Sequence, residues 1–126
     1  MNKFDLAFMD MAITFSRTST AKRSKVGCLI VLDGQIISNG CNGRVPGGSN
    51  ACEISPELSR PDVRHAELNA ISKIAKSTIS CLGADMYLTL SPCLQCAIMI
   101  ESSGIKKVYY KEKYRITDGL DYLIKH

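Results

Sequence analysis

The sequence predicts a three-layer α/β domain with a mixed central sheet, and three observations support this prediction. Short aliphatic and β-branched runs alternate with longer amphipathic segments along the chain. An Asp-Gly pair separates two of the runs, which is typical of an antiparallel hairpin. Two later runs lie on either side of a helical segment, which predicts a parallel crossover. Together they indicate helices packed on both faces of one sheet.

Four helices are expected from apolar residues that recur at three- and four-residue spacing. The first spans 3–15 and the second spans 64–76. The third runs from Pro92, whose fixed φ suits a helix start, to Ser103, and Gly104 can end it in a left-handed conformation. The fourth is the short segment 118–125. The residues expected to face the core are Phe4, Phe8, Met11 and Phe15 in the first helix, Leu68, Ile71 and Ala75 in the second, and Leu120 and Ile124 in the fourth.

Four strands are expected between these helices. The hairpin strands are 26–32 and 35–38, joined at Asp33-Gly34, and the later strands are 85–90 and 105–110. The segment 39–64 is rich in Gly and Pro and has little periodicity, which predicts a long loop. Loops of this length in small domains are usually either functional or disordered, and the position of this one between clearly predicted elements favours a functional loop.

The length and composition limit the classes of protein to which the chain can belong. The chain has 126 residues, 45% of them hydrophobic, and a net charge of +4, and it shows no internal repeat or linker. We therefore expect a single domain, 1–126. No apolar signal segment begins the chain and no apolar run is long enough to span a bilayer, which favours a reducing cytoplasm over secretion or a membrane. The mildly basic charge suits a phosphate-bearing ligand and does not require a nucleic-acid polymer.

Two short motifs at predicted helix starts carry metal-binding groups. His65-Ala66-Glu67 begins the second helix, and Pro92-Cys93-Leu94-Gln95-Cys96 begins the third. Two thiolates and one imidazole suit zinc, and three protein ligands leave a fourth position for water. Glu67 is then placed to carry protons. Two alternatives remain: Cys93 and Cys96 as a redox pair, or a structural zinc site. The latter needs a fourth ligand from cysteines that have no partner at short spacing and are expected to be small buried hydrophobes, namely Cys28, Cys41, Cys52 and Cys81.

The spacing His-x-Glu followed by Pro-Cys-x-x-Cys is a signature of zinc nucleobase deaminases. Over residues 22–114 the sequence resembles the deoxycytidylate deaminases of the cytidine and deoxycytidylate deaminase superfamily. The matching strings are Ser-Lys-Val-Gly-Cys at 24–28, Gly-Cys-Asn-Gly-Arg-Val-Pro-Gly at 40–47, His-Ala-Glu-Leu-Asn-Ala-Ile at 65–71, and Leu-Ser-Pro-Cys at 90–93. The resemblance implies a cytidine deaminase-like fold and hydrolytic deamination of deoxycytidylate (dCMP) to dUMP and ammonia by a zinc-activated hydroxide.

The resemblance also implies roles for individual residues. His65, Cys93 and Cys96 hold one zinc ion, and Glu67 moves protons to the ring nitrogen and the departing amine. The Ala66 backbone and the Ser91 carbonyl meet the pyrimidine edge. The other expected substrate contacts are Asn42 at the sugar, Arg23, Ser24 and Lys25 at the phosphate, and Tyr114 beside the nucleotide.

Related enzymes are commonly hexamers activated by dCTP and inhibited by dTTP with Mg²⁺. The resemblance therefore implies a homo-oligomer and an allosteric loop containing Asn42, Gly43, Pro46 and Gly47. No second zinc is expected, because only Cys52 follows the glycine-rich segment. Relatives usually continue into one more strand, whereas this chain ends at His126, so the final strand can be missing. The small size suits a virus-encoded enzyme that acts in the host cytoplasm.

Two other functions remain open. A deaminase acting on a base in single-stranded nucleic acid or tRNA would share the zinc motifs and could use the lysines near 106–115, but the chain has no Trp and three Phe for a stacking platform. A noncatalytic zinc-stabilised binding module would have no use for Glu67.

Overall fold

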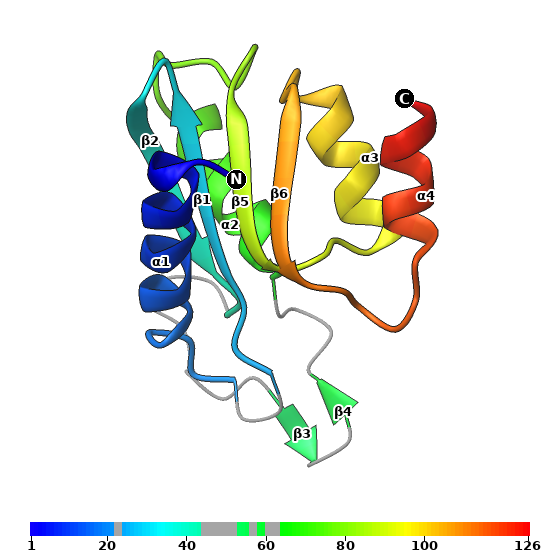
Figure 1. The fold of residues 1–126 in the computed structure, drawn as a ribbon. Coiled ribbons are helices and arrows are strands. Elements are labelled where there is room, and N and C mark those ends of the chain that lie inside the picture. The colour runs from blue at the N-terminus through cyan, green and yellow to red at the C-terminus, as the bar shows by residue number, and fades with distance from the viewer. Residues whose placement is uncertain (22–23, 44–52, 56–57, 60–63) are drawn as a thin grey trace.

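The computed structural model describes residues 1–21, 24–43, 53–55, 58–59 and 64–126, which form the layered arrangement in Figure 1. The helices are α1 (Lys3–Ser16), α2 (Ala66–Ala75), α3 (Leu94–Ser102) and α4 (Asp118–Lys125). The strands are β1 (Gly27–Leu32), β2 (Gln35–Cys41), β3 (Glu53–Ser55), β4 (Leu58–Ser59), β5 (Asp85–Leu90) and β6 (Lys107–Glu112).

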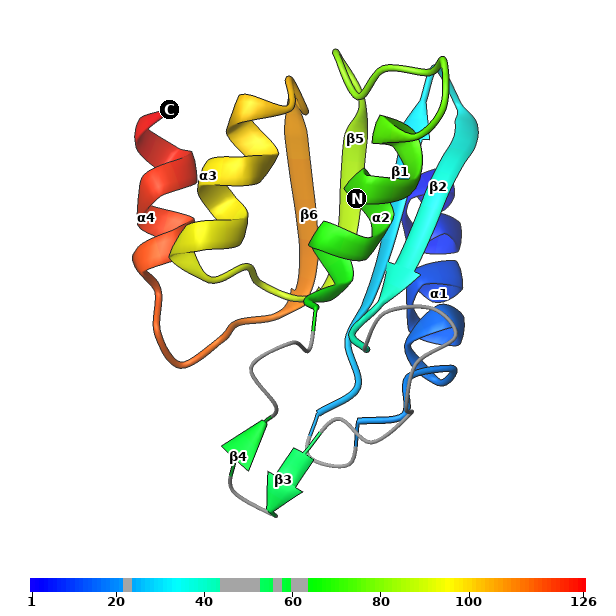
Figure 2. The ribbon, with the colours of Figure 1, turned by 180° about the vertical axis from the view of Figure 1, so that it is seen from behind.

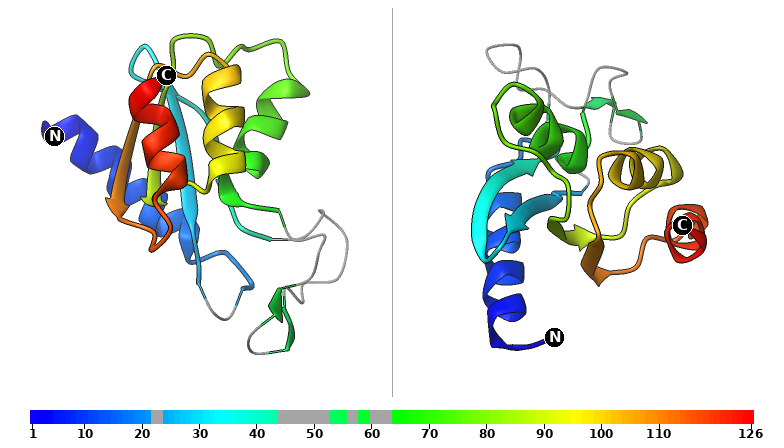
Figure 3. Two further views of the ribbon diagram at one scale, coloured as in Figure 1. Left: turned by 90° about the vertical axis from the view of Figure 1, so that its right-hand side faces the viewer. Right: turned by 90° about the horizontal axis from the view of Figure 1, so that it is seen from above.

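The main sheet has the strand order β2-β1-β5-β6. β1 pairs antiparallel with β2 and β5, and β5 pairs parallel with β6 across the α3 crossover. α1 covers one face, α2 and α3 cover the other, and α4 lies beside α3 (Figures 1, 2 and 3). The predicted three-layer architecture, mixed sheet and parallel crossover are confirmed. β3 and β4 form a separate antiparallel pair.

The turn between β1 and β2 has the conformation expected of Asp-Gly. Asp33 has φ 50° and Gly34 has φ 77°, so both central positions are left-handed, as a two-residue hairpin turn requires. Gly104 likewise has φ 86° and follows the C-terminus of α3, as predicted.

Two hydrophobic clusters lie on the two faces of the sheet, and successive residues of β1 alternate between them. Cys28 and Ile30 pack toward α2 and α3, together with Met86, Leu88 and Ile100. Leu29 and Val31 pack toward α1, together with Met9, Ala12 and Tyr87. Cys28 and Cys81 are buried and unpaired, as expected of small hydrophobes.

The predicted core-facing residues of α1 were partly wrong. Phe4 and Met11 are 64% and 39% exposed, whereas Met9 and Ala12 are buried. The helix turns this face inward because β1 has a glycine opposite Ala12: a Cβ at Gly27 would overlap the Ala12 carbonyl oxygen. The close contact that Gly27 permits therefore determines which face of α1 is buried, and the size of the phenylalanine side chains does not.

The expected core faces of α2 and α4 also need correction. In α2, Leu68 is 37% exposed and Ala75 is exposed, while Ala66, Glu67, Ala70 and Ile74 are buried. In α4, Leu120 is buried as expected, but Ile124 is 83% exposed. Small alanines let α2 lie close to β2, so the larger Leu68 points away from the sheet.

Several predicted boundaries were wrong: among them, α2 begins at Ala66 rather than at 64, and β6 ends at Glu112 rather than at 110. β2 continues to Cys41, because Asn39, Gly40 and Cys41 pair with β1, and β3 and β4 lie within the segment expected to be loop throughout. α3 begins at Leu94, because Cys93 has the extended backbone of an N-cap (φ −71°, ψ 171°). β6 begins at Lys107, in register with Asp85 of β5. No helix within the described ranges is long and apolar enough to cross a membrane.

Candidate metal centre and active site

The N-termini of α2 and α3 meet at the candidate site. His65 is the N-cap of α2 and Cys93 is the N-cap of α3, and neither side chain makes a capping hydrogen bond. Cys96 lies one turn into α3 and is buried. The positive ends of the two helix dipoles favour thiolates at this point.

The ligand atoms of these three residues are close enough to share one metal ion. They lie within 4.8 Å of one another, with His65 Nδ1 3.3 Å from Cys96 Sγ and 3.6 Å from Cys93 Sγ. Tetrahedral zinc with ordinary bond lengths would place such nitrogen and sulfur atoms about 3.6 Å apart. The donor set and its spacing therefore fit zinc.

The protonation states of these three side chains depend on one another. Hydrogen bonds from Cys96 and then from His65 lower the pKa of the Cys93 thiol to about 3, so this side chain is a thiolate at neutral pH. The adjacent Cys93 raises the pKa of His65, and it also raises the pKa of Cys96, which acts as the proton donor. A thiolate already present beside an imidazole is a suitable starting point for metal binding.

Glu67 lies in the first turn of α2 and is 4% exposed. Burial raises the pKa of its carboxyl group, and a hydrogen bond with Cys96 partly opposes this rise. A carboxylate that is buried beside a metal centre and has a raised pKa is suited to accept and return a proton.

α2 is fixed to β2 by direct backbone contact and by side-chain hydrogen bonds. A Cβ at Gly40 would lie 2.6 Å from the Ala66 carbonyl oxygen, so only glycine permits this approach. Ser38 Oγ donates to the Ala70 carbonyl (2.7 Å), and Asn69 Nδ2 donates to the Cys41 carbonyl (2.8 Å). Sequence reasoning missed the role of Asn69; an amide on the sheet-facing side of α2, two residues after Glu67, was the available signal.

The segment that carries Asn42 lies next to His65. Gly43 and Arg64 exchange backbone hydrogen bonds of 3.0 and 2.8 Å. The Asn42 side chain donates to the Ser24 carbonyl (2.7 Å) and accepts from the Val26 N–H (2.9 Å). The structure thus connects Asn42, Gly43 and the Ser24–Val26 segment to the start of α2. It also shows that the Asn42 amide supports the backbone of this segment.

Ser91 and Tyr114 lie together on the α3 side of the site. Ser91 is buried, its N–H donates to the Glu112 carbonyl (2.9 Å), and its Oγ accepts from the Tyr114 N–H (2.7 Å). Ser24 and Lys25 are exposed. The remaining predicted site residues, Arg23, Pro46 and Gly47, lie outside the described residues.

Comparison with known proteins decides the family. Residues 2–112 match the model of the cytidine and deoxycytidylate deaminase zinc-binding region. The chain belongs to this deaminase family. The resemblance stated from the sequence is therefore confirmed, as is the deaminase-type α/β fold.

Three similar proteins illustrate the relationship. The cyanophage S-TIM5 dCMP deaminase, solved in complex with dCMP and dUMP, is 44% identical with a TM-score of 0.95; the match covers 99% of this chain and 93% of that one. The deoxycytidylate deaminase of Enterobacteria phage T4 is 34% identical, with 84% of this chain and 76% of the phage protein covered. ComE operon protein 2 of Bacillus subtilis is 37% identical over 86% of this chain and 59% of that protein.

Proposed function

We propose that this chain is a zinc-dependent deoxycytidylate deaminase that converts dCMP and water to dUMP and ammonia. The observation that carries the proposal is the cluster of His65, Cys93 and Cys96 with Glu67 buried beside it. The match over almost the full length to a dCMP deaminase solved with substrate and product supports dCMP as the substrate.

His65, Cys93 and Cys96 would hold the zinc ion. Bound zinc lowers the pKa of a water molecule to about 7 and so supplies a nucleophile at neutral pH. Water supplies the new carbonyl oxygen and both of the protons that are moved. Glu67 would accept the first proton from the attacking water and give it to the pyrimidine ring nitrogen, and would then pass the second to the departing amine nitrogen. Its raised pKa suits both steps, because the carboxyl group exchanges protons more readily near neutral pH than an ordinary glutamate does.

The substrate is oriented by groups on both sides of the centre. The Ala66 backbone and the Ser91 carbonyl contact the pyrimidine edge, Asn42 contacts the sugar, and Tyr114 lies beside the nucleotide. Arg23, Ser24 and Lys25 bind the phosphate. Asn42 donates to the Ser24 carbonyl and accepts from the Val26 N–H, and the adjacent Gly43 pairs with Arg64. These bonds support the assignment, because they keep the phosphate-binding segment close to the start of α2.

Regulation and assembly extend the proposal. The loop containing Asn42, Gly43, Pro46 and Gly47 takes part in binding a nucleoside triphosphate with Mg²⁺, with dCTP as activator and dTTP as inhibitor. The enzyme is a homo-oligomer, and the assembly to test first is a hexamer. The phage-encoded relatives support a virus-encoded enzyme that acts in the host cytoplasm.

Ultraviolet-monitored deamination tests the substrate. The zinc-loaded protein is incubated with dCMP, with deoxycytidine and with a cytosine-containing oligonucleotide, each with and without dCTP and Mg²⁺. Turnover of dCMP far above that of deoxycytidine supports the nucleotide assignment and the phosphate site. Turnover of the oligonucleotide alone would instead indicate a deaminase of polymeric nucleic acid, and turnover of none would favour a noncatalytic zinc module.

A further inference from the structure

α4 lies against the metal-binding loop at a glycine, Gly119. Gly119 is buried in the first turn of α4 and has ordinary helical backbone. A Cβ at this position would overlap the Pro92 carbonyl oxygen and would lie 2.7 Å from the Cys93 carbonyl oxygen. These neighbours are backbone atoms, so they cannot rotate away as a flexible side chain could.

The loop that Gly119 contacts is already fixed on its other side. The Ser91 N–H donates to the Glu112 carbonyl, and Ser91 Oγ accepts from the Tyr114 N–H. The 91–93 segment is therefore held between the end of β6 and the start of α4. Since Cys93 is an N-cap, a shift of its backbone would move its Sγ relative to His65 and Cys96.

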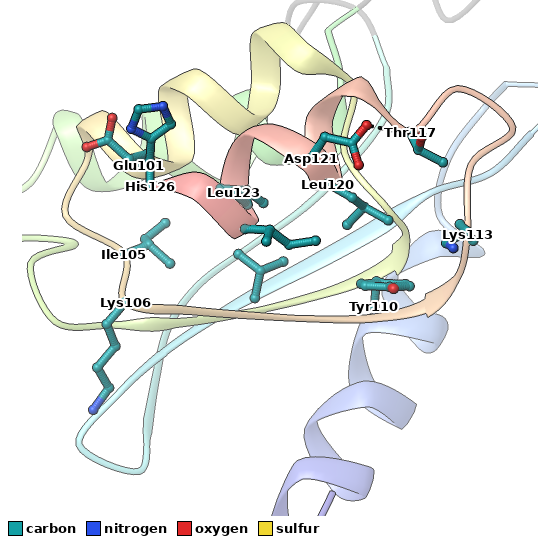
Figure 4. A pocket seen from close by; sticks show the side chains of 12 residues that line it. Glu101, Ile105, Lys106, Tyr110, Lys113, Thr117, Leu120, Asp121, Leu123 and His126 are labelled. Carbon is teal, nitrogen blue, oxygen red and sulfur yellow. Dashed lines mark hydrogen bonds between the residues drawn. The ribbon is translucent and has the colours of Figure 1, made fainter.

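α4 is also linked to α3 by a side-chain hydrogen bond. Tyr122 Oη donates to Glu101 Oε1 of α3 (2.9 Å). Between α4 and β6 there is a cavity of about 440 Å³, lined in part by Ile105, Leu120 and Leu123 (Figure 4). At the start of α4, Gly119 brings the helix into direct contact with the backbone of the metal loop at Pro92 and Cys93.

We propose that Gly119 is a positioning residue that sets the place of Cys93 for metal binding. The inference rests on the proposed zinc site. Groups that orient metal ligands typically contribute about 10- to 100-fold to metal affinity. The Gly119→Ala variant is therefore expected to bind zinc about 10-fold or more weakly. Helix propensity alone predicts the opposite trend, because alanine favours the helical conformation more than glycine does.

The matched control is Gly27→Ala. A Cβ at Gly27 would overlap the Ala12 carbonyl oxygen and would lie 2.8 Å from Ser16 N, so the collision is similar in kind. It occurs between β1 and α1, on the face of the sheet opposite the metal ligands. Zinc affinity is measured by competition with a chelator, and ligand geometry is measured from the absorption bands of the Co²⁺-substituted proteins.

The proposal predicts weaker zinc binding and an altered Co²⁺ spectrum in Gly119→Ala, with both properties near those of the unmodified protein in Gly27→Ala. Equal zinc affinity in the two variants would overturn it. Failure of the unmodified protein to bind zinc would instead contradict the proposed function, so the two failures are distinguishable.

Hydrogen exchange on the unmodified protein decides the question even if Gly119→Ala does not fold. If α4 positions Cys93, metal binding must in turn stabilise the docking of α4. Added zinc is expected to slow amide exchange in 119–125 more than in α1. An equal change in the two helices, or no change in α4, would overturn the proposal.

Discussion

Glu67 combines nearly complete burial with a raised pKa, and that combination is costly for a residue whose only task is structural. We expect Glu67→Gln to lower the turnover of dCMP by at least about 100-fold, because glutamine has a similar shape but cannot transfer a proton. Zinc content and fold should be retained, since the ligands are His65, Cys93 and Cys96. Initial rates and metal analysis of the purified variant measure both effects.

Glu112→Gln provides the matched control, because Glu112 is exposed and contacts Ser91 through its backbone carbonyl only. The control should keep both turnover and zinc. Turnover in Glu67→Gln equal to that of the control would contradict the proton-transfer role.

Asp5 and Tyr87 form a hydrogen bond that makes stability depend on pH. Tyr87 Oη donates to Asp5 Oδ1 (2.6 Å), and this bond is the main reason why the pKa of Asp5 is below its ordinary value of 3.8. A carboxyl group whose pKa is lowered by folding stabilises the folded state above its unfolded pKa, and this contribution is lost as the pH falls through the folded pKa. The unmodified protein should therefore exceed Tyr87→Phe in stability most clearly above about pH 4.

Urea unfolding of both proteins from pH 2.5 to 7, in the presence of chelator, measures this difference without a contribution from metal loss. The difference between the two urea midpoints should be constant above about pH 4 and should shrink below it. A difference that is independent of pH over the whole range would show that the charge of Asp5 is not involved.

At the scale of single residues, the sequence alone identified the site residues whose function follows from the type of their side chain. His65, Glu67, Cys93 and Cys96 could be selected because few other functions need those groups at helix starts. Gly119 could not be selected, because its importance lies in the absence of a Cβ opposite a loop that is distant in sequence.

At the scale of elements, the position of α2 on β2 depends on hydrogen bonds between side chains and backbone. Removing the Asn69 amide would leave the Cys41 carbonyl without this donor. We expect Asn69→Ala to lower the free energy of unfolding by about 1–2 kcal/mol. It should also raise the KM for dCMP, because Cys41 adjoins Asn42. Urea unfolding and steady-state kinetics measure the two effects.

Ser72→Ala is the control for this prediction, because Ser72 Oγ donates to the Leu68 carbonyl within α2 itself. It should change stability and KM little. If Asn69→Ala behaves like Ser72→Ala, the bond to Cys41 does not hold α2 in place.

The elements also show which parts of the fold sequence periodicity can predict. The order of helices and strands followed from the alternation of patterns, and β5 and α4 have the predicted bounds. The buried face of α1 did not follow, because it depends on Gly27 in another element. The end of β2 could not be predicted for a similar reason. Asn39 and Gly40 favour turns locally, but their pairing with Leu29 and Cys28 of β1 keeps them in the strand.

At the scale of the whole molecule, the metal centre joins α2 and α3. Its ligands His65 and Cys93 are 28 residues apart in the sequence. The ligands converge only in the folded state, so zinc should stabilise the folded state by an amount that rises with the logarithm of free zinc above the dissociation constant. We expect the thermal midpoint to rise with free zinc and to fall when a chelator is added. At a free zinc concentration 100 times the dissociation constant, the stabilisation should be about 2.7 kcal/mol.

The variant His65→Ala separates this linkage from nonspecific effects of zinc. It removes one of three ligands but leaves the N-cap backbone of α2 and the sheet unchanged, so its metal-free midpoint should be close to that of the metal-free unmodified protein. Its midpoint should no longer respond to micromolar zinc. Because the ligands come from the starts of both α2 and α3, a retained response in His65→Ala would mean that zinc stabilises the molecule through other groups, and the centre would not be the connection between these two helices.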